Sequence, residues 1–187
     1  IDIPPKEFAN SADVWATPAI ARVFDANCDD KVDEGDPPNV IFVSGDAKQT
    51  CCSCGGYSPS TCRTGVLRVL DGRNGDELWS LDESKPGSGF AGMSVAVGDV
   101  DGDQRLDVIS VSGDGHVVMV DGTGQVQRVS DLPIDDQATG AFGWGGGLAL
   151  GDMDGDGHPE IAFARTLFST KDGAITRLWV GDGGRGD

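Results

Sequence analysis

The sequence predicts an all-β fold, and three observations point to it. Glycine is very frequent, with 29 of the 187 residues, so many tight turns are expected. Short apolar runs are separated by Asp-Gly and Asn-Gly pairs, which supply the positive φ that hairpin turns need. The chain also repeats one pattern three times, in which a small apolar strand, an acidic loop and a second apolar strand follow one another.

The repeat sets the order of the predicted elements. The acidic loops, called loops one, two and three below, span residues 25–36, 99–107 and 152–160. A third strand with its turn is expected after each of them, at 65–75, 116–124 and 174–184. A fourth strand is expected at 76–81 and 125–130, and the third unit is expected to lack its last strand because the chain stops at Asp187. Four short antiparallel strands per unit, at a pitch of about 50 residues, describe the blades of a β-propeller.

The chain is predicted to be a single propeller-type domain over residues 1–187. Its blades are expected at about 11–84, 88–131 and 140–187, with a Cys-rich insertion at about 47–64 in the first. Closed propellers typically have about four to eight blades, so three blades do not complete a ring. We therefore expect a fragment, or a unit that other chains complete. The start at Ile1, without a Met or an apolar signal region, also suggests a mature product or a fragment.

The acidic loops predict calcium sites. Ca²⁺ takes about six to eight oxygen ligands, and acids at alternate positions of a short loop turn their side chains onto one centre. The expected side-chain ligands lie at positions one, three and five and at a closing position: Asp25, Asn27, Asp29 and either Asp33 or Asp36 in loop one; Asp99, Asp101, Asp103 and Asp107 in loop two; Asp152, Asp154, Asp156 and Glu160 in loop three. We expect about three ions. Mg²⁺ is less suited because it keeps its waters and resists cages made only of protein.

Two further positions of the loops bear on this interpretation. Position seven holds Lys31, Arg105 and His158, which we expect to contribute only a backbone carbonyl while the side chain points outward. Position four holds Gly102 and Gly155, which allow a sharp turn, whereas loop one has Cys28 there. The alternative is that Asp-Gly-Asp runs are only good turn formers. Three such loops in register favour a metal role.

The net charge indicates which classes of partner to expect, and the cysteine content indicates the redox compartment of the protein. A formal net charge of −17 repels phosphate backbones and anionic lipid surfaces, so we expect no nucleic acid and no membrane insertion. No apolar run approaches the length of a membrane span. The five cysteines are Cys28, Cys51, Cys52, Cys54 and Cys62. They suggest disulfides formed in an oxidising compartment, with one cysteine left over, although a zinc site remains an alternative for the cluster.

Two stretches of the chain carry a family resemblance. FAGMSVAVGDVDGD begins at Phe90 and FGWGGGLALGDMDGD begins at Phe142. At these residues the chain resembles the FG-GAP/VCBS repeats of integrin-α propellers and of many secreted bacterial proteins, and the resemblance extends from about Ser11 onward. It implies that the acidic loops carry Ca²⁺ on one face, while partners engage the other face or the blade edges. The Cys-rich insertion and the missing blades depart from the family pattern.

The predicted function is that of an extracellular binding or adhesion module, secreted or at the cell surface, for a glycan or protein ligand. A structural building block that assembles with further copies of itself is the first alternative. The second is a propeller domain of a larger polysaccharide-active enzyme, since paired carboxylates are common in so acidic a chain. The chain itself is not expected to be an enzyme, because it has no Ser or Cys nucleophile in a recognisable elbow.

Two weaker patterns are interpreted structurally. The tripeptide Arg185-Gly186-Asp187 spells an integrin-recognition motif, but in a chain rich in Gly and Asp it is expected to be a turn. The four tryptophans, Trp15, Trp79, Trp144 and Trp179, could stack on sugar rings if exposed. Their recurring strand positions favour packing in the core between blades.

Overall fold

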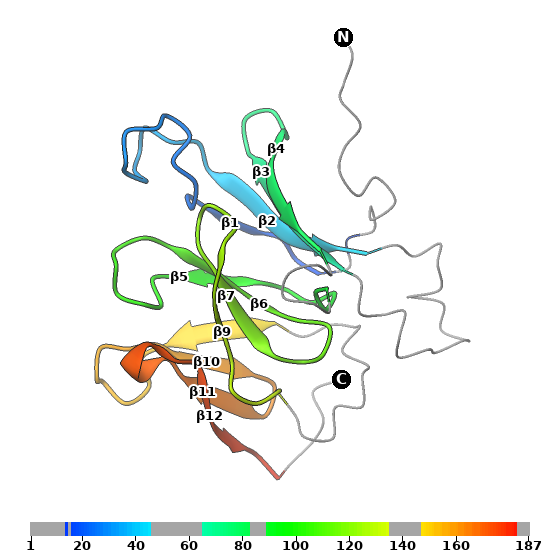
Figure 1. Ribbon diagram of the computed structural model, residues 1–187, viewed down its shortest axis with the longest axis vertical. Coiled ribbons are helices and arrows are strands. Elements are labelled where there is room, and N and C mark those ends of the chain that lie inside the picture. The colour runs from blue at the N-terminus through cyan, green and yellow to red at the C-terminus, as the bar shows by residue number, and fades with distance from the viewer. Residues whose placement is uncertain (1–13, 15, 46–64, 83–88, 135–146, 183–187) are drawn as a thin grey trace, which may run out of the picture.

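The computed structural model describes residue 14 and residues 16–45, 65–82, 89–134 and 147–182. These residues form three antiparallel sheets of four strands each, and their only helical element is a single 3₁₀ turn at Lys171–Gly173. Figure 1 shows the sheets side by side, as the blades of a propeller. The predicted all-β fold of propeller blades is confirmed.

Each blade places its strands in chain order, from an inner first strand to an outer fourth strand. Blade one contains β1 (Ala19–Ala21), β2 (Asn39–Ser44), β3 (Val66–Asp71) and β4 (Glu77–Leu81). Blade two contains β5 (Ala96–Gly98), β6 (Asp107–Val111), β7 (Val117–Val120) and β8 (Val126–Val129). Blade three contains β9 (Leu148–Gly151), β10 (Glu160–Phe163), β11 (Thr166–Ser169) and β12 (Thr176–Val180).

Blade three is complete, so the expectation that it lacks its last strand is wrong. The segment taken for its third strand is the fourth, β12, and the third is the short strand β11. β10 and β11 pair through Phe163 and Thr166, which leaves a turn of only Ala164 and Arg165 between them. Ala164 has a φ of 49°, in the left-handed region that glycine or asparagine usually fills. The sequence carries no turn signal at this hairpin, and the strand was therefore missed.

The hydrophobic core lies between the blades. Blade two lies between blades one and three, so both of its faces are buried. Alternate residues of its strands point to opposite faces and pack against different neighbours. Val108, Val118 and Val120 pack with blade one in one cluster, whereas Ile109 and Met119 pack with blade three in another. Each fully buried side chain of this size stabilises the fold by about 1.5–3 kcal/mol. The burial on both faces explains why β6 and β7 have apolar residues at consecutive positions.

The inner strands hold the blades in a common orientation. β5 lies between β1 and β9, and the backbones of Ser94 and Gly147 form a parallel bridge between blades two and three. A Cβ added at Gly98 would lie 2.8 Å from Leu150 Cδ1, so the two strands approach closely and a larger residue at Gly98 would displace the Leu150 side chain. Each acidic loop connects the first and second strands of its blade. All three loops therefore project from the same side of the molecule, on the left in Figure 1.

The tryptophan prediction holds for one residue and fails for another. Trp79, on β4, is partly buried against the cluster between blades one and two. Trp179, on β12, is 53% exposed, so the expectation of core packing is wrong there. Trp15 and Trp144 lie outside the described residues, as do the Cys-rich insertion at 47–64 and the tripeptide at 185–187. Among the described residues, no helix has the length and apolarity needed to span a membrane.

Candidate metal centre

The first six residues of the three acidic loops adopt one conformation. In each loop the carboxylate at position one accepts hydrogen bonds from the backbone N–H groups at positions four and six, at 2.7–3.0 Å. The acceptors and donors are Asp25 with Cys28 and Asp30, Asp99 with Gly102 and Gln104, and Asp152 with Gly155 and Gly157. This bonding curls the loop around the position-one side chain and satisfies backbone donors that have no strand partner.

The same two positions have positive φ in all three loops. At position four the values are 60° for Cys28, 83° for Gly102 and 77° for Gly155. At position six they are 66° for Asp30, 69° for Gln104 and 88° for Gly157. The cysteine in loop one therefore takes the turn that glycine takes in the other two. The second turn, at position six, was not recognised from the sequence, because Asp30 and Gln104 carry no glycine signal.

A buried carboxylate closes each loop. Asp107 Oδ2 accepts a hydrogen bond from Val100 N at 3.0 Å, and Glu160 Oε2 accepts one from Met153 N at 2.7 Å. Both acids are almost fully buried, and each is the first residue of the second strand of its blade. They hold the end of each loop to its second residue.

In loop one the closing place is taken by Asp36. Its Oδ1 accepts a hydrogen bond from Ala26 N at 2.8 Å, the bond that Asp107 and Glu160 make to the second residue of their loops. Asp36 is buried, whereas Asp33 is exposed and accepts from Gly35 N at 2.7 Å. Of the two alternatives that the sequence left open, the geometry therefore places Asp36, at position twelve, where loops two and three have their closing acids.

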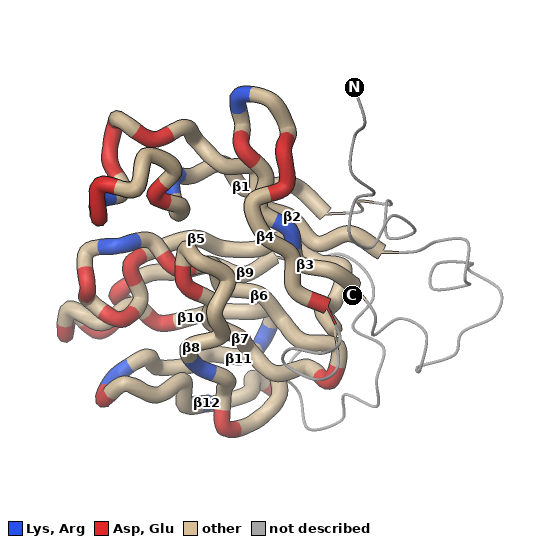
Figure 2. The backbone as a smooth tube through the Cα atoms, turned by 45° about the horizontal axis from the view of Figure 1, so that its top comes forward, with Lys and Arg blue, Asp and Glu red and all other residues tan. Residues whose placement is uncertain are grey.

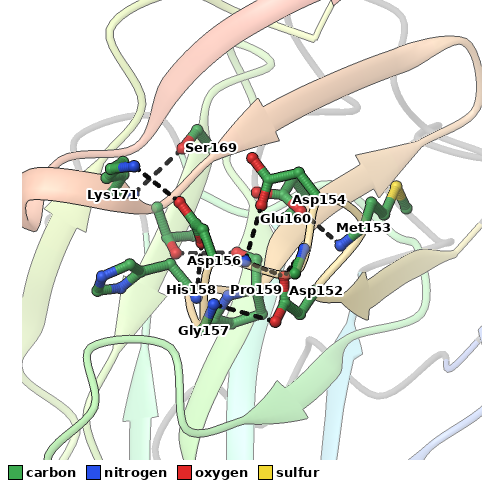
Figure 3. Close-up of polar contacts among 12 residues, drawn as sticks. Asp152, Met153, Asp154, Asp156, Gly157, His158, Pro159, Glu160, Ser169 and Lys171 are labelled. Atoms are coloured by element: carbon green, nitrogen blue, oxygen red, sulfur yellow. Dashed lines mark hydrogen bonds and ion pairs between the residues drawn. The ribbon is translucent and has the colours of Figure 1, made fainter.

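Three carboxylates converge in each of loops two and three. One oxygen from each of Asp99, Asp101 and Asp107 lies within 4.8 Å of the others, and the same holds for Asp152, Asp154 and Glu160. Figure 3 shows the loop-three group, with the N–H of Gly157 donating to Asp152. These are positions one, three and closing. Loop one has Asn27 at position three, so it offers an amide oxygen and two carboxylates at the equivalent places. Such oxygen sets are suited to a hard cation such as Ca²⁺.

The position-five acids point elsewhere. Asp103 and Asp156 are not part of the converging groups. Their Oδ1 atoms accept from the backbone N–H of Arg105 and His158 at position seven, at 2.7 and 2.9 Å. In loop one, Asp29 likewise accepts from Lys31 N at 3.0 Å. The structure thus fixes the position-seven backbone through the position-five acid in every loop.

Basic side chains from neighbouring segments contact the loops. Lys171 Nζ forms an ion pair with Asp156 Oδ2 at 2.9 Å, which Figure 3 shows beside the converging group. Arg105 Nη2 reaches out of loop two and donates to the carbonyl of Asp30 in loop one at 2.8 Å. Arg128 Nη2 lies 3.9 Å from Asp101 Oδ2. The outward direction of Arg105 agrees with a position that offers only its carbonyl to a metal.

The electrostatics differ between the closing acids. Burial, together with the nearby charges of Asp101, Asp103 and Asp99, raises the pKa of Asp107 to about 6, while the hydrogen bond from the Val100 N–H acts against this rise. The pKa of Asp36 is lowered instead, first by the N–H of Asp33. In loop three, the Lys171 ammonium lowers the pKa of Asp156. Loop two therefore holds its carboxylates together at an electrostatic cost that a bound cation would offset.

Acidic residues gather on one side of the molecule. Figure 2 shows the Asp and Glu residues concentrated at the acidic loops, on the side from which these loops project. Cys28, within loop one, is an exposed free cysteine, while Cys51, Cys52, Cys54 and Cys62 lie outside the described residues. The disulfide prediction for those four cysteines stays a prediction.

The chain is similar to a solved structure and to a family model, but to no curated protein sequence. The crystal structure of the Vibrio cholerae biofilm matrix protein Bap1 is similar over 92% of this chain, with 30% sequence identity and a TM-score of 0.66. The chain spans about a quarter (25%) of the length of that structure. No curated protein sequence matches the chain. The model of the FG-GAP-like repeat family matches residues 99–163, which include loops two and three. Over these residues, which hold loops two and three and the blade strands between them, the chain is therefore similar to an FG-GAP-like repeat.

Proposed function

We propose that this chain is a calcium-stabilised propeller module that acts outside the cell as a binding or adhesion unit. The observation that carries the metal part is the convergence of three carboxylates in each of loops two and three, on the same backbone. Loop one, closed by Asp36, is the third proposed site. Like charges held this closely repel one another and destabilise the empty loop. A divalent cation that binds between them would relieve this repulsion, which favours its binding.

The extracellular part of the proposal is supported by the FG-GAP-like repeat and by the similarity to a biofilm matrix protein. The acidic surface would be neutralised locally by calcium, which is plentiful outside cells, at the loop face. The opposite face and the blade seams then remain for a glycan or protein ligand. We propose binding rather than catalysis for this chain.

A thermal melt tests the metal part directly. The chain is stripped with EDTA, desalted, and melted with and without millimolar calcium chloride. Binding to the native state alone stabilises each site by about 2.7 kcal/mol when free calcium is about 100 times its dissociation constant. We expect a large rise in melting temperature with calcium and a smaller one with magnesium at the same ionic strength. No rise with calcium would reduce the acidic loops to turn formers and overturn the proposal.

Two matched variants locate the effect. Asp152→Asn removes one charge from the converging group of loop three and should lower the calcium-dependent rise. Asp172→Asn makes the same chemical change at an exposed residue outside the loops, where a φ of 55° suits asparagine. It should leave the calcium-dependent rise unchanged. Equal losses in both variants would mean that calcium acts on the overall charge and not at the loop.

A further inference from the structure

The acid at position five has different partners in loops two and three. Asp103 Oδ1 accepts a hydrogen bond from Arg105 N at 2.7 Å, and its Oδ2 has no hydrogen-bond or ion-pair partner among the described residues. Asp156 Oδ1 accepts the equivalent bond from His158 N at 2.9 Å, but its Oδ2 forms an ion pair with Lys171 Nζ, also at 2.9 Å (Figure 3). Both oxygens of Asp156 are therefore in use, whereas Asp103 keeps one available.

A tight turn of blade three presents Lys171 to loop three. The third and fourth strands of every blade pair through a β-bulge, and in blade three they are joined by the 3₁₀ turn at Lys171–Gly173. Thr170 Oγ1, just before this turn, donates a hydrogen bond to the carbonyl of Pro159 at 2.8 Å. Pro159 directly precedes the closing acid Glu160. The turn is thus attached to the end of the same loop that its lysine contacts.

The corresponding turns of blades one and two bring no cation to the position-five acid. Arg73 lies in the turn of blade one, where Gly72 N donates to the carbonyl of Pro38 at 2.9 Å in the same kind of attachment. Arg73 pairs with Asp71 of its own hairpin, at 2.6 Å between Nη2 and Oδ2. The turn of blade two, residues 121–125, contains no basic residue. Within the described ranges, the pairing of a hairpin cation with the position-five acid is therefore specific to loop three.

Loop two also has an ion pair, but with a different acid. Arg128 Nη2 lies 3.9 Å from Asp101 Oδ2, too far for a hydrogen bond, and Asp101 stays in the converging group. Lys171, in contrast, is hydrogen-bonded to Asp156, which lies outside the converging group of loop three. The pKa of Lys171 is raised first by this hydrogen bond and also by the charge of Asp154, a member of that group. The ammonium therefore lies within electrostatic reach of the converging carboxylates.

We propose that Lys171 lowers the calcium affinity of loop three by withholding Asp156 from the ion. Ca²⁺ takes about six to eight oxygen ligands, so a fourth carboxylate beside the three converging ones strengthens its binding. In loop three, Asp156 can join them only when its ion pair with Lys171 breaks, whereas in loop two Asp103 has a free oxygen. The inference rests on the proposed calcium function and adds to it a residue that tunes one site.

A calcium titration followed by NMR reads the loops separately. The isotope-labelled chain is stripped with EDTA, desalted and titrated with calcium chloride. The amide of Gly155 reports on loop three because it donates to Asp152, and the amide of Gly102 reports on loop two because it donates to Asp99. Lys171→Gln should lower the dissociation constant read at Gly155 about two- to fivefold, since one exposed ion pair no longer competes with the ion. The dissociation constant read at Gly102 should stay unchanged.

Two further variants identify the cause. Lys171→Arg keeps the positive charge and should keep the wild-type dissociation constant at Gly155, so equal effects of the Gln and Arg variants would overturn the inference. Asp156→Asn removes the acid that Lys171 holds, so in that background Lys171→Gln should have no effect. A full effect there would show that the ammonium acts by repelling the ion and would overturn the withholding of Asp156.

The calcium function and the role of Lys171 fail in different ways. If neither Gly102 nor Gly155 responds to calcium, the proposed calcium function falls, and this inference falls with it. If Gly102 responds while the Gly155 dissociation constant is unchanged or higher in Lys171→Gln, only the role of Lys171 falls. A Gly155 amide that responds in neither the wild type nor Lys171→Gln, beside a responding Gly102, has the same meaning.

Discussion

Loop one and loop two share their first six residues in conformation and differ in how they close. Loop two closes at position nine with Asp107, which takes one backbone hydrogen bond, from Val100. Loop one closes at position twelve with Asp36, which takes three, from Ala26, Asn27 and Asp33. The pKa of Asp36 is accordingly lowered, while the pKa of Asp107 is raised to about 6. The comparison teaches that one closing acid is satisfied by the backbone of its own loop, whereas the other is buried among like charges with a single backbone hydrogen bond.

The largest expected effect follows from removing the closing acid of loop one. Asp36→Ala leaves three backbone N–H groups of loop one without their acceptor and also removes a proposed calcium ligand. We expect the largest fall in melting temperature of the variants considered, both in EDTA and in calcium. Asp33→Ala is the matched control, because Asp33 is exposed and its side chain accepts only from Gly35 N among the described residues. Equal effects of the two variants would break the distinction between positions nine and twelve.

The closing acid of loop two should behave in the opposite way without metal. Asp107→Asn keeps an oxygen that can accept from Val100 but removes the charge that Asp99 and Asp101 repel. In EDTA at neutral pH we expect the variant to be at least as stable as the wild type. In calcium it should be less stable, by up to the contribution of one site, about 2.7 kcal/mol at 100 times the dissociation constant. Loss of stability in both conditions would show that Asp107 is structural, like Asp36.

The pH dependence of the melting temperature, measured without metal, tests the same difference between Asp107 and Asp36. Asp107 has a raised pKa in the folded state, so the folded chain binds its proton more tightly than the unfolded chain does. The stability that this proton gives is present below pH 4 and is lost as the pH rises to about 6. The melting temperature of the wild type, relative to Asp107→Asn, should therefore fall across this window in desalted, metal-free buffer. A constant difference would contradict the assigned cause.

The smallest expected effect concerns position four. Cys28 holds a φ of 60° in loop one, where Gly102 holds 83° in loop two. Cys28→Gly should raise the stability by up to about 1 kcal/mol, because glycine reaches the left-handed region without strain. Gly102→Cys should lower it by a similar amount. Chemical denaturation of both variants measures the pair, and a destabilised Cys28→Gly would mean that the cysteine makes a contact that the comparison overlooks.

The blades could be predicted from sequence because their signals are local. Apolar runs, Asp-Gly turns and the repeated acidic loop fix most strands and positions one and three of each site. The failures arise where no local signal exists. The Ala164–Arg165 turn has no glycine, so β11 was missed. Gln104 adopts a positive φ that only alignment with Gly157 could have indicated.

The remaining features of the site depend on contacts between distant residues. Lys171 lies 15 positions from Asp156, and Arg105 contacts Asp30 across 75 positions, so no spacing rule could pair them. The exposure of Trp179 is of the same kind. Its equivalent, Trp79, is covered by a turn of the following blade, and no described turn follows blade three. A repeat predicts the position of a residue, but its burial depends on the neighbour.

The bulge beside each outer strand also affects aggregation. A strand at the margin of a sheet exposes unpaired N–H and C=O groups, which another chain can use to extend the sheet into a fibre. A bulge twists the strand and interrupts the regular ladder that such an addition needs. β4, β8 and β12 all pair with their neighbours through a bulge, so the margin of every blade is a poor template for another strand. Blades of this kind can gain neighbours through their faces while their margins resist fibre growth.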